Sequence, residues 1–253
     1  MPDVQTIDEV VAQLDQIIAA AIASRSRIGL FAALYRQVTL KIRRGIADGL
    51  FEDGARMARL DAVFANRYLA ALSAWQAGGT PSQSWQFAFD ATKRDDLVVI
   101  QHLLLGINAH INLDLGIAAA AVCPGDALPG LHTDFNRINL ILSGMVEGVK
   151  RTIAKFSPLT HLLDEVGGSF ENGMINFSMA AARDDAWQHA ALLAPLDPAL
   201  IGPTITLIDT KATFLGRLVA DPGRMLTRVL DAIHLGESPD VTEIIQALNA
   251  LVP

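Results

Sequence analysis

The chain has 253 residues, of which 51% are hydrophobic and 19% charged, and its formal net charge is −7 at neutral pH. An acidic chain lacks the basic surface of a nucleic-acid groove, so nucleic acid is excluded as the expected partner. The single cysteine, Cys123, excludes an intrachain disulfide, and the N-terminus lacks the basic start of a secretory signal. We therefore expect a cytoplasmic protein. No transmembrane segment is expected either, because the uninterrupted apolar runs are far shorter than the ~20 residues that span a bilayer.

Apolar residues recur with the 3.6-residue period of amphipathic helices, and no run alternates with the period of two that is typical of strands. The first helix is expected over 7–22, because Thr6 and Glu9 have the spacing of a capping box. Glycines and prolines separate the later segments. Further helices are expected over 28–48, 54–76, 82–91, 96–122, 133–155, 177–194, 204–219, 223–234 and 241–251, with a loop over 166–176.

These segments predict an all-α fold. No glycine- or proline-rich stretch is long enough to separate two domains, so residues 1–253 are expected to form a single all-helical domain. The expected architecture is a bundle of about eight to ten helices around one buried central helix.

The segment 97–122 is apolar on nearly all sides, which is typical of a helix at the centre of a domain. It nevertheless carries polar side chains that would each cost about 1–3 kcal/mol if they were buried without partners. Within it, Gly106 indicates a close approach by a ligand or a crossing helix, because a mid-helix glycine costs about 1 kcal/mol relative to alanine. Four residues recur at intervals of four and form one ridge of the helix: His102, Gly106, His110 and Asp114.

We interpret His102, His110 and Asp114 as candidate catalytic residues and as candidate ligands of a divalent metal. Two imidazoles with carboxylates suit Zn, Fe or Mn. The helix over 133–155 follows a short connection, so it is expected to fold back on the central helix and add Asp134 as a ligand. Asp61 is the other candidate carboxylate, with a solvated surface acid as the alternative.

Arg67 lies six residues after Asp61 on the expected helix over 54–76. This offset is poor for an ion pair within one helix. We therefore expect Arg67 to pair with a different carboxylate.

Two functional interpretations follow. The first is an enzyme that is metal-assisted, or in which Asp114 orients His110 for acid–base catalysis, with a hydrophobic small molecule or a phosphoester as substrate. A hydrophobic substrate is favoured by the apolar surroundings of the ridge. The second is a non-catalytic helical protein that binds a ligand or a partner, in which the buried polar network only fixes helix packing.

Several stretches of the sequence carry resemblances to known families. FAALYRQVT, LDAVFANRYLAAL, QHLLLGINAHINLDL and HTDFNRINLIL together resemble a family of bacterial and fungal proteins known only as a domain of unknown function, over residues 31–187. Its most specific motif is AHIN followed by DL, and the resemblance implies no activity. The HxxxD spacing of His110 and Asp114 is also similar to a helix of zinc-dependent phospholipases C and single-strand nucleases. That likeness implies metal ligation and phosphoester hydrolysis.

Overall fold

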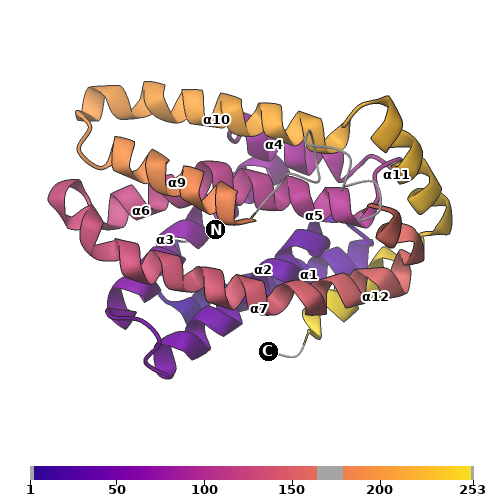
Figure 1. Ribbon diagram of the computed structural model, residues 1–253, viewed down its shortest axis with the longest axis horizontal. Helices are drawn as coiled ribbons and strands as arrows, with labels where there is room; N and C mark the ends of the chain where they lie inside the picture. The colour runs from indigo at the N-terminus through magenta and orange to yellow at the C-terminus, as the bar shows by residue number, and fades with distance from the viewer. Residues whose placement is uncertain (1–2, 164–178, 252–253) are drawn as a thin grey trace.

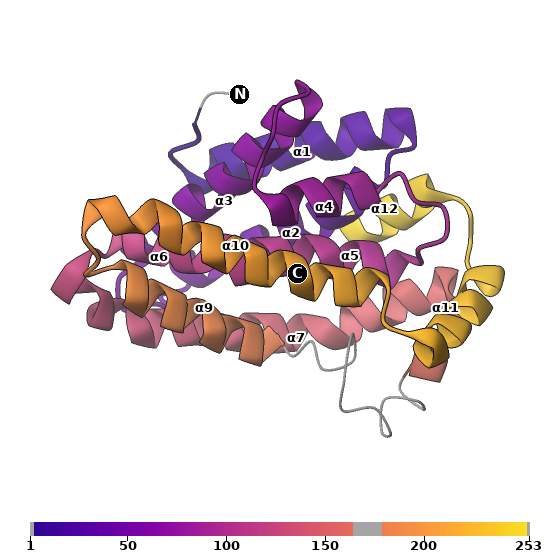
Figure 2. The same cartoon turned by 90° about the horizontal axis from the view of Figure 1, so that it is seen from above.

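The computed structural model describes residues 3–163 and 179–251. All regular secondary structure in those residues is helical. The prediction of an all-α fold is confirmed. The longer helices run beside one another along the longest axis of the molecule, with α5 and α6 in the middle of the stack (Figures 1 and 2). The loop predicted over 166–176 and the first residues of the helix predicted over 177–194 lie outside the described residues.

The helices of the first half are α1 (Ile7–Ser24), α2 (Ile28–Ala47), α3 (Gly54–Gln76) and α4 (Gln83–Ala91). The central stretch consists of α5 (Val99–Asn108), the π-helix η1 (Ala109–Leu115) and α6 (Gly116–Val122). A 3₁₀-helix, η2 (Gly125–Leu131), leads into α7 (His132–Phe156) and the short 3₁₀-helix η3 (Pro158–Thr160). The remaining described helices are α9 (Met179–Leu193), α10 (Pro198–Ala220), α11 (Arg224–Gly236) and α12 (Val241–Asn249).

The helix starts show how local sequence sets these bounds. The capping box at α1 is present, since Thr6 Oγ1 accepts from the backbone N–H of Glu9 and Glu9 accepts from that of Thr6. Helix α10 begins at Pro198, earlier than the predicted residue 204. Proline is well tolerated at the first helical position, and Asp197 caps the helix by accepting from the backbone of Ala199 at 2.8 Å.

The central stretch is buried, as predicted. Helices α2, α3, α4, α9 and α10 pack around it. Among the described residues, Val99–Val122 is the one helical stretch that is long and apolar enough to cross a membrane by length and composition. However, 83% of its most apolar window is buried inside the protein, and a core helix passes the same test. The other helices thus supply its apolar surroundings.

Two glycines allow this close packing. A Cβ atom added at Gly106 would lie 2.5 Å from Cγ of Phe31 on α2, and one added at Gly116 would lie 2.6 Å from the backbone oxygen of Ala186 on α9. Both distances are shorter than real Cβ contacts. Gly106 therefore makes room for a crossing helix, which is one of the two reasons that the sequence suggested.

We expect Gly106→Ala to destabilise the protein by about 1–3 kcal/mol, because the new methyl group overpacks the contact with Phe31. The matched control is Gly144→Ala in α7, where nothing lies within 4 Å of the added Cβ. That change should stabilise the protein by up to about 1 kcal/mol through helix propensity. Urea denaturation of both variants measures the effects. Equal shifts in the two variants would contradict the close approach of Phe31.

Candidate functional site

The motif AHINLDL folds as η1, and all seven of its residues are buried. A π-helix is rare and is found frequently at functional sites. The expectation of one continuous α-helix is therefore wrong here, and the wider turn changes which side chains share a face. His110 and Asp114 still lie close together, with 3.4 Å between Nδ1 and Oδ2. Asn112 donates to Asn108 at 2.9 Å, and Asn108 donates to the backbone of α10, so this second pair serves helix packing.

Asp114 makes three polar contacts although its side chain is only 1% exposed. Arg67 donates from Nε to Oδ1 at 2.7 Å, and Trp85 donates from Nε1 to Oδ2 at 2.7 Å. His110 is the third neighbour. The prediction that Arg67 pairs with a carboxylate other than Asp61 is confirmed. Charge-assisted hydrogen bonds of this kind fix the position of the carboxylate.

The imidazole of His110 lies in an aromatic cage. Its ring stacks on Phe64 with 3.5 Å between centroids and 10° between planes, and the ring of Tyr35 meets it edge-on at 4.5 Å. Burial lowers the pKa of His110, while the hydrogen bond and charge of Asp114 act in the opposite direction. His110 is therefore neutral near neutral pH.

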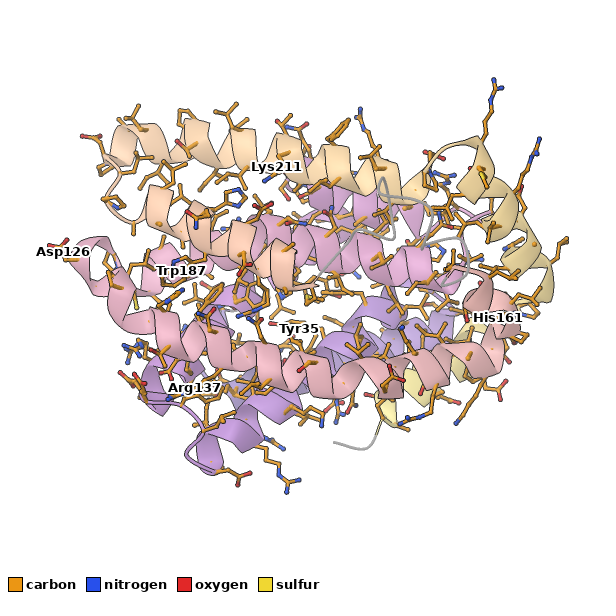
Figure 3. All side chains as sticks on the ribbon, viewed as in Figure 1. Tyr35, Asp126, Arg137, His161, Trp187 and Lys211 are labelled. Carbon is orange, nitrogen blue, oxygen red and sulfur yellow. The ribbon has the colours of Figure 1, made fainter. Side chains whose placement is uncertain are left out.

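The side chains of Tyr35, Asp61, Tyr68 and His110 form what we call the inner cluster. The rings of Tyr35 and Tyr68 are 6.1 Å apart and those of Tyr68 and His110 are 6.2 Å apart. Asp61 lies one helical turn before Phe64, which stacks on His110. The hydroxyls of both tyrosines, both oxygens of Asp61 and Nε2 of His110 are buried without a hydrogen-bond partner among the described residues. Figure 3 shows Tyr35 in the interior, between the helices.

Burial has a large effect on the ionisation of this cluster. It raises the pKa of Asp61 from 3.8 to about 7. Burial, followed by the charges of Asp61 and Asp114, also raises the pKa of Tyr35 well above its ordinary value. The interpretation of Asp61 as a solvated acid is therefore wrong. Perturbed acids of this kind are common at functional sites.

An open cleft with a volume of about 870 Å³ runs along α3. Its walls are one face of α3, the start of α4, the end of α6 and the N-terminal segment 3–5. Asn66 fastens that segment through two hydrogen bonds with the backbone of Val4, at 2.9 and 2.8 Å. The volume falls in the range of small-molecule sites. The polar or charged side chains that line it are Asp3, Gln5, Arg59, Asn66, Arg67, Ser82 and Asp114.

Asp114 and Trp85 belong both to this cleft and to the group around His110. Asp114 therefore lines the cleft, with its side chain almost fully buried at the inner wall, while His110 is not part of the lining. This order reverses the expected one, in which Asp114 stands behind His110 and only orients it.

His102 lies apart from this group. It lines a separate cavity of about 20 Å³ together with Arg27, Thr92 and several aromatic side chains. Burial, followed by the charge of Arg27, lowers the pKa of His102 to about 4. Phe31 lines the same cavity and packs against Gly106, which lies on the ridge between His102 and His110. The expected convergence of the two histidines on one pocket is not found. Phe31 of α2 lies against the ridge between them, at Gly106.

Asp134 is also held elsewhere. Its carboxylate accepts from the backbone N–H groups of Glu52 and Asp53 and from the side chains of Arg56 and Arg137, at 2.7 to 3.0 Å. Burial alone would raise the pKa of Asp134, but these hydrogen bonds outweigh it and hold the pKa below its usual value. Helix α7 packs against α2 and α12, and Asp134 joins its first turn to the start of α3. Asp134 therefore fastens two helix ends and does not join the ridge.

The five predicted metal ligands are thus spread over several places. Only His110 and Asp114, of the five, are joined by a direct contact. In the part of the chain that the structure describes, no three His, Cys, Asp or Glu side chains are grouped so that they could hold one metal ion. The structure therefore does not bring together the ligand set of His102, His110, Asp114, Asp134 and Asp61.

Sequence reasoning did not assign Trp85 or Tyr35 to the site. Both are aromatic residues in apolar segments, and such residues most often belong to a hydrophobic core. Two features of the structure distinguish them from ordinary core residues: the hydrogen bond from the indole N–H of Trp85 to Asp114, and the buried, unpartnered hydroxyl of Tyr35. The sequence did single out Asn66 and Arg67, because these polar residues interrupt an otherwise apolar helical segment.

A family model named "Family of unknown function (DUF5995)" matches residues 7–222. The chain belongs to this family. The DUF5995 match extends from the start of α1 to just beyond α10, so it includes the cleft apart from the segment 3–5, and all of the inner cluster. No curated protein and no solved structure matches the chain. The likeness of the HxxxD spacing to zinc-dependent phospholipases C therefore has no support from a curated relative.

Proposed function

We propose that this protein is an acid–base enzyme that holds a small, largely apolar molecule in the cleft along α3 and exchanges a proton with it through Asp114. The observation that carries the proposal is the position of Asp114. It is the charged group that lines the open cleft and also contacts the buried imidazole of His110. A cleft of about 870 Å³ accommodates a small-molecule substrate.

The neighbours of Asp114 suit the role of a positioned base. Arg67 and Trp85 each donate to a different oxygen at 2.7 Å, which fixes the plane of the carboxylate. Nδ1 of His110, when it carries the proton, donates towards the oxygen that Trp85 also contacts. Asp114 is then the candidate catalytic residue, and His110 is a positioning residue. The aromatic cage keeps water away from the far side of the pair, which strengthens these electrostatic interactions.

Metal-assisted hydrolysis is not part of this proposal. Of the five side chains that the sequence suggested as ligands, the structure joins His110 to Asp114 only. The proposal therefore keeps the acid–base form of the sequence-based hypothesis.

A non-catalytic binding protein is the second candidate. The observation in its favour is that both oxygens of Asp114 already accept strong hydrogen bonds, from Arg67 and Trp85. A carboxylate whose two oxygens are already engaged has fewer lone pairs left to accept a proton from a substrate. In this case the network would only hold η1 in place, and the cleft would bind its ligand unchanged.

The proton transfer can be measured without knowing the natural substrate. The protein is incubated in D₂O with ketones, esters and lactones that have chains of about four to ten carbons, and mass spectrometry follows deuterium incorporation and turnover. We expect Asp114→Asn to lower the rate by about a hundredfold or more, as is usual when a general base is lost. The matched control is Asp126→Asn, an exposed acid at one end of the molecule (Figure 3).

His110→Gln distinguishes the positioning role from a purely structural one. It should change the pH dependence of the rate, because the group behind the carboxylate no longer titrates. Equal rates for the wild type and Asp114→Asn would contradict the enzyme proposal. Binding of these compounds without exchange or turnover would favour the binding protein.

A further inference from the structure

Arg67 has donors left over after its contact with Asp114. A guanidinium carries five N–H donors, and the contact with the carboxylate uses the one on Nε. The side chain is 30% exposed and lines the cleft. Among the described residues, Asp114 is the single ion-pair partner of Arg67. Its terminal N–H groups are therefore accessible to a ligand in the cleft.

Arg59 lies on the same face of α3, eight residues before Arg67, and also lines the cleft. It is exposed, and in the described ranges 3–163 and 179–251 it makes no salt bridge. Two acids line the same cleft. Asp114 is already matched by Arg67, and the exposed Asp3 forms no ion pair with either arginine within those ranges. Arg59 is therefore a positive charge at the cleft that no described side chain neutralises through an ion pair.

Small apolar side chains also line the cleft. Ala62 and Ala70 line it from α3, and Val122 lines it from the end of α6. Trp85 also lines the cleft and donates to Asp114. These small apolar side chains suit contact with an acyl chain or a flat ring. The cleft thus combines an apolar floor with guanidinium groups.

We propose that the ligand of the cleft is an amphiphilic acid, whose carboxylate or phosphate monoester is bound by Arg59 and Arg67 and whose apolar body lies over the alanines of α3. Guanidinium groups favour such heads because they match two oxygens at once. This inference rests on the cleft of the proposed function, and it does not depend on proton transfer by Asp114.

Isothermal titration with three probes of equal chain length tests the inference: octanoate, octyl phosphate and octanol. We expect one of the two acids to bind at least tenfold more tightly than octanol, and the better of them identifies the head group. Arg59→Gln should weaken binding of that acid about tenfold and leave octanol unchanged. The matched control is Arg43→Gln, which removes an exposed arginine paired with Asp8 outside the cleft; it should change neither affinity.

Equal affinities for octanol and both acids would overturn the inference, as would an Arg59→Gln variant that binds the acid as the wild type does. Absence of binding by all three probes would also overturn it. Asp114→Asn separates the two proposals. It should bind the acid as tightly as the wild type or more tightly, because Arg67 loses a competing carboxylate. Acid binding that persists without any proton exchange would leave this inference standing and remove the enzyme proposal.

Discussion

Asp61→Asn is expected to stabilise the protein at neutral pH and to remove part of the pH dependence of its stability. The side chain of Asp61 is buried, only 4% of the residue is exposed, and neither carboxylate oxygen has a partner among the described residues. Ionising an acid in such a place is costly. Burial accordingly raises the pKa of Asp61 to about 7. Asparagine has nearly the same shape and cannot ionise.

The sign of the effect follows from proton binding. Between the ordinary pKa of 3.8 and about 7, the folded protein keeps a proton on Asp61 that the unfolded chain has lost. Stability therefore falls as the pH rises through this window and levels off above about pH 7. The difference in pKa corresponds to a contribution on the order of 4 kcal/mol. The variant should lack this decline.

The histidines complicate the wild-type profile. Burial lowers the pKa values of His102 and His110, so these residues make the protein more stable as the pH rises towards 6.5. The useful quantity is the difference in the free energy of unfolding between the wild type and Asp61→Asn, measured by urea denaturation from pH 4 to pH 8. The exposed control Asp126→Asn should show no comparable trend. A difference that is independent of pH would mean that Asp61 is not protonated in the folded state near pH 5.

The fold was predictable from the sequence because its main determinants are local. The capping box of Thr6 and Glu9, the turn glycines and the all-round apolarity of 97–122 are read directly from the residue order. The structure confirms the buried central stretch and the close approach of a helix at Gly106. Arg67 could also be assigned to a distant carboxylate, because its offset from Asp61 excluded a good pair within the helix.

The site was less predictable, because it depends on backbone register and on contacts between distant segments. A π-helix as short as 109–115 leaves no recognisable pattern of apolar residues in the sequence. The sequence therefore predicted α-helical spacing there. The antiparallel return predicted for α7 assumed that neighbouring helices pack together. Instead, Arg56 and the backbone N–H groups of Glu52 and Asp53, at and just before the start of α3, bind Asp134. The cleft joins α3, α4, α6 and the segment 3–5, which no local pattern connects.

Asp114→Ala should cause the largest loss of stability among single changes at the site. Removing the carboxylate leaves the indole N–H of Trp85 buried without a partner and leaves Arg67 without its counter-ion. A buried donor left without a partner typically costs about 1–3 kcal/mol, and the loss of the ion pair with the part-exposed Arg67 adds to this. We expect a fall of that size in the free energy of unfolding, measured by urea denaturation. The free energy of unfolding of Asp114→Asn should lie between those of the wild type and Asp114→Ala, because the amide keeps the volume of the side chain and one acceptor oxygen.

His110→Phe is the matched comparison for the same pair. If His110 were the main partner of the Asp114 carboxylate, removing the imidazole would leave a buried charge without a partner and cost several kcal/mol of stability. In the structure, Asp114 keeps Arg67 and Trp85, both at 2.7 Å, whereas the contact with His110 is longer at 3.4 Å. Phenylalanine also preserves the stacking on Phe64 and removes the unpartnered Nε2. We therefore expect His110→Phe to change stability by less than about 1.5 kcal/mol, as is usual for swaps that conserve volume. Equal losses in His110→Phe and Asp114→Ala would show that the imidazole, and not the pair of strong donors, holds Asp114 in η1.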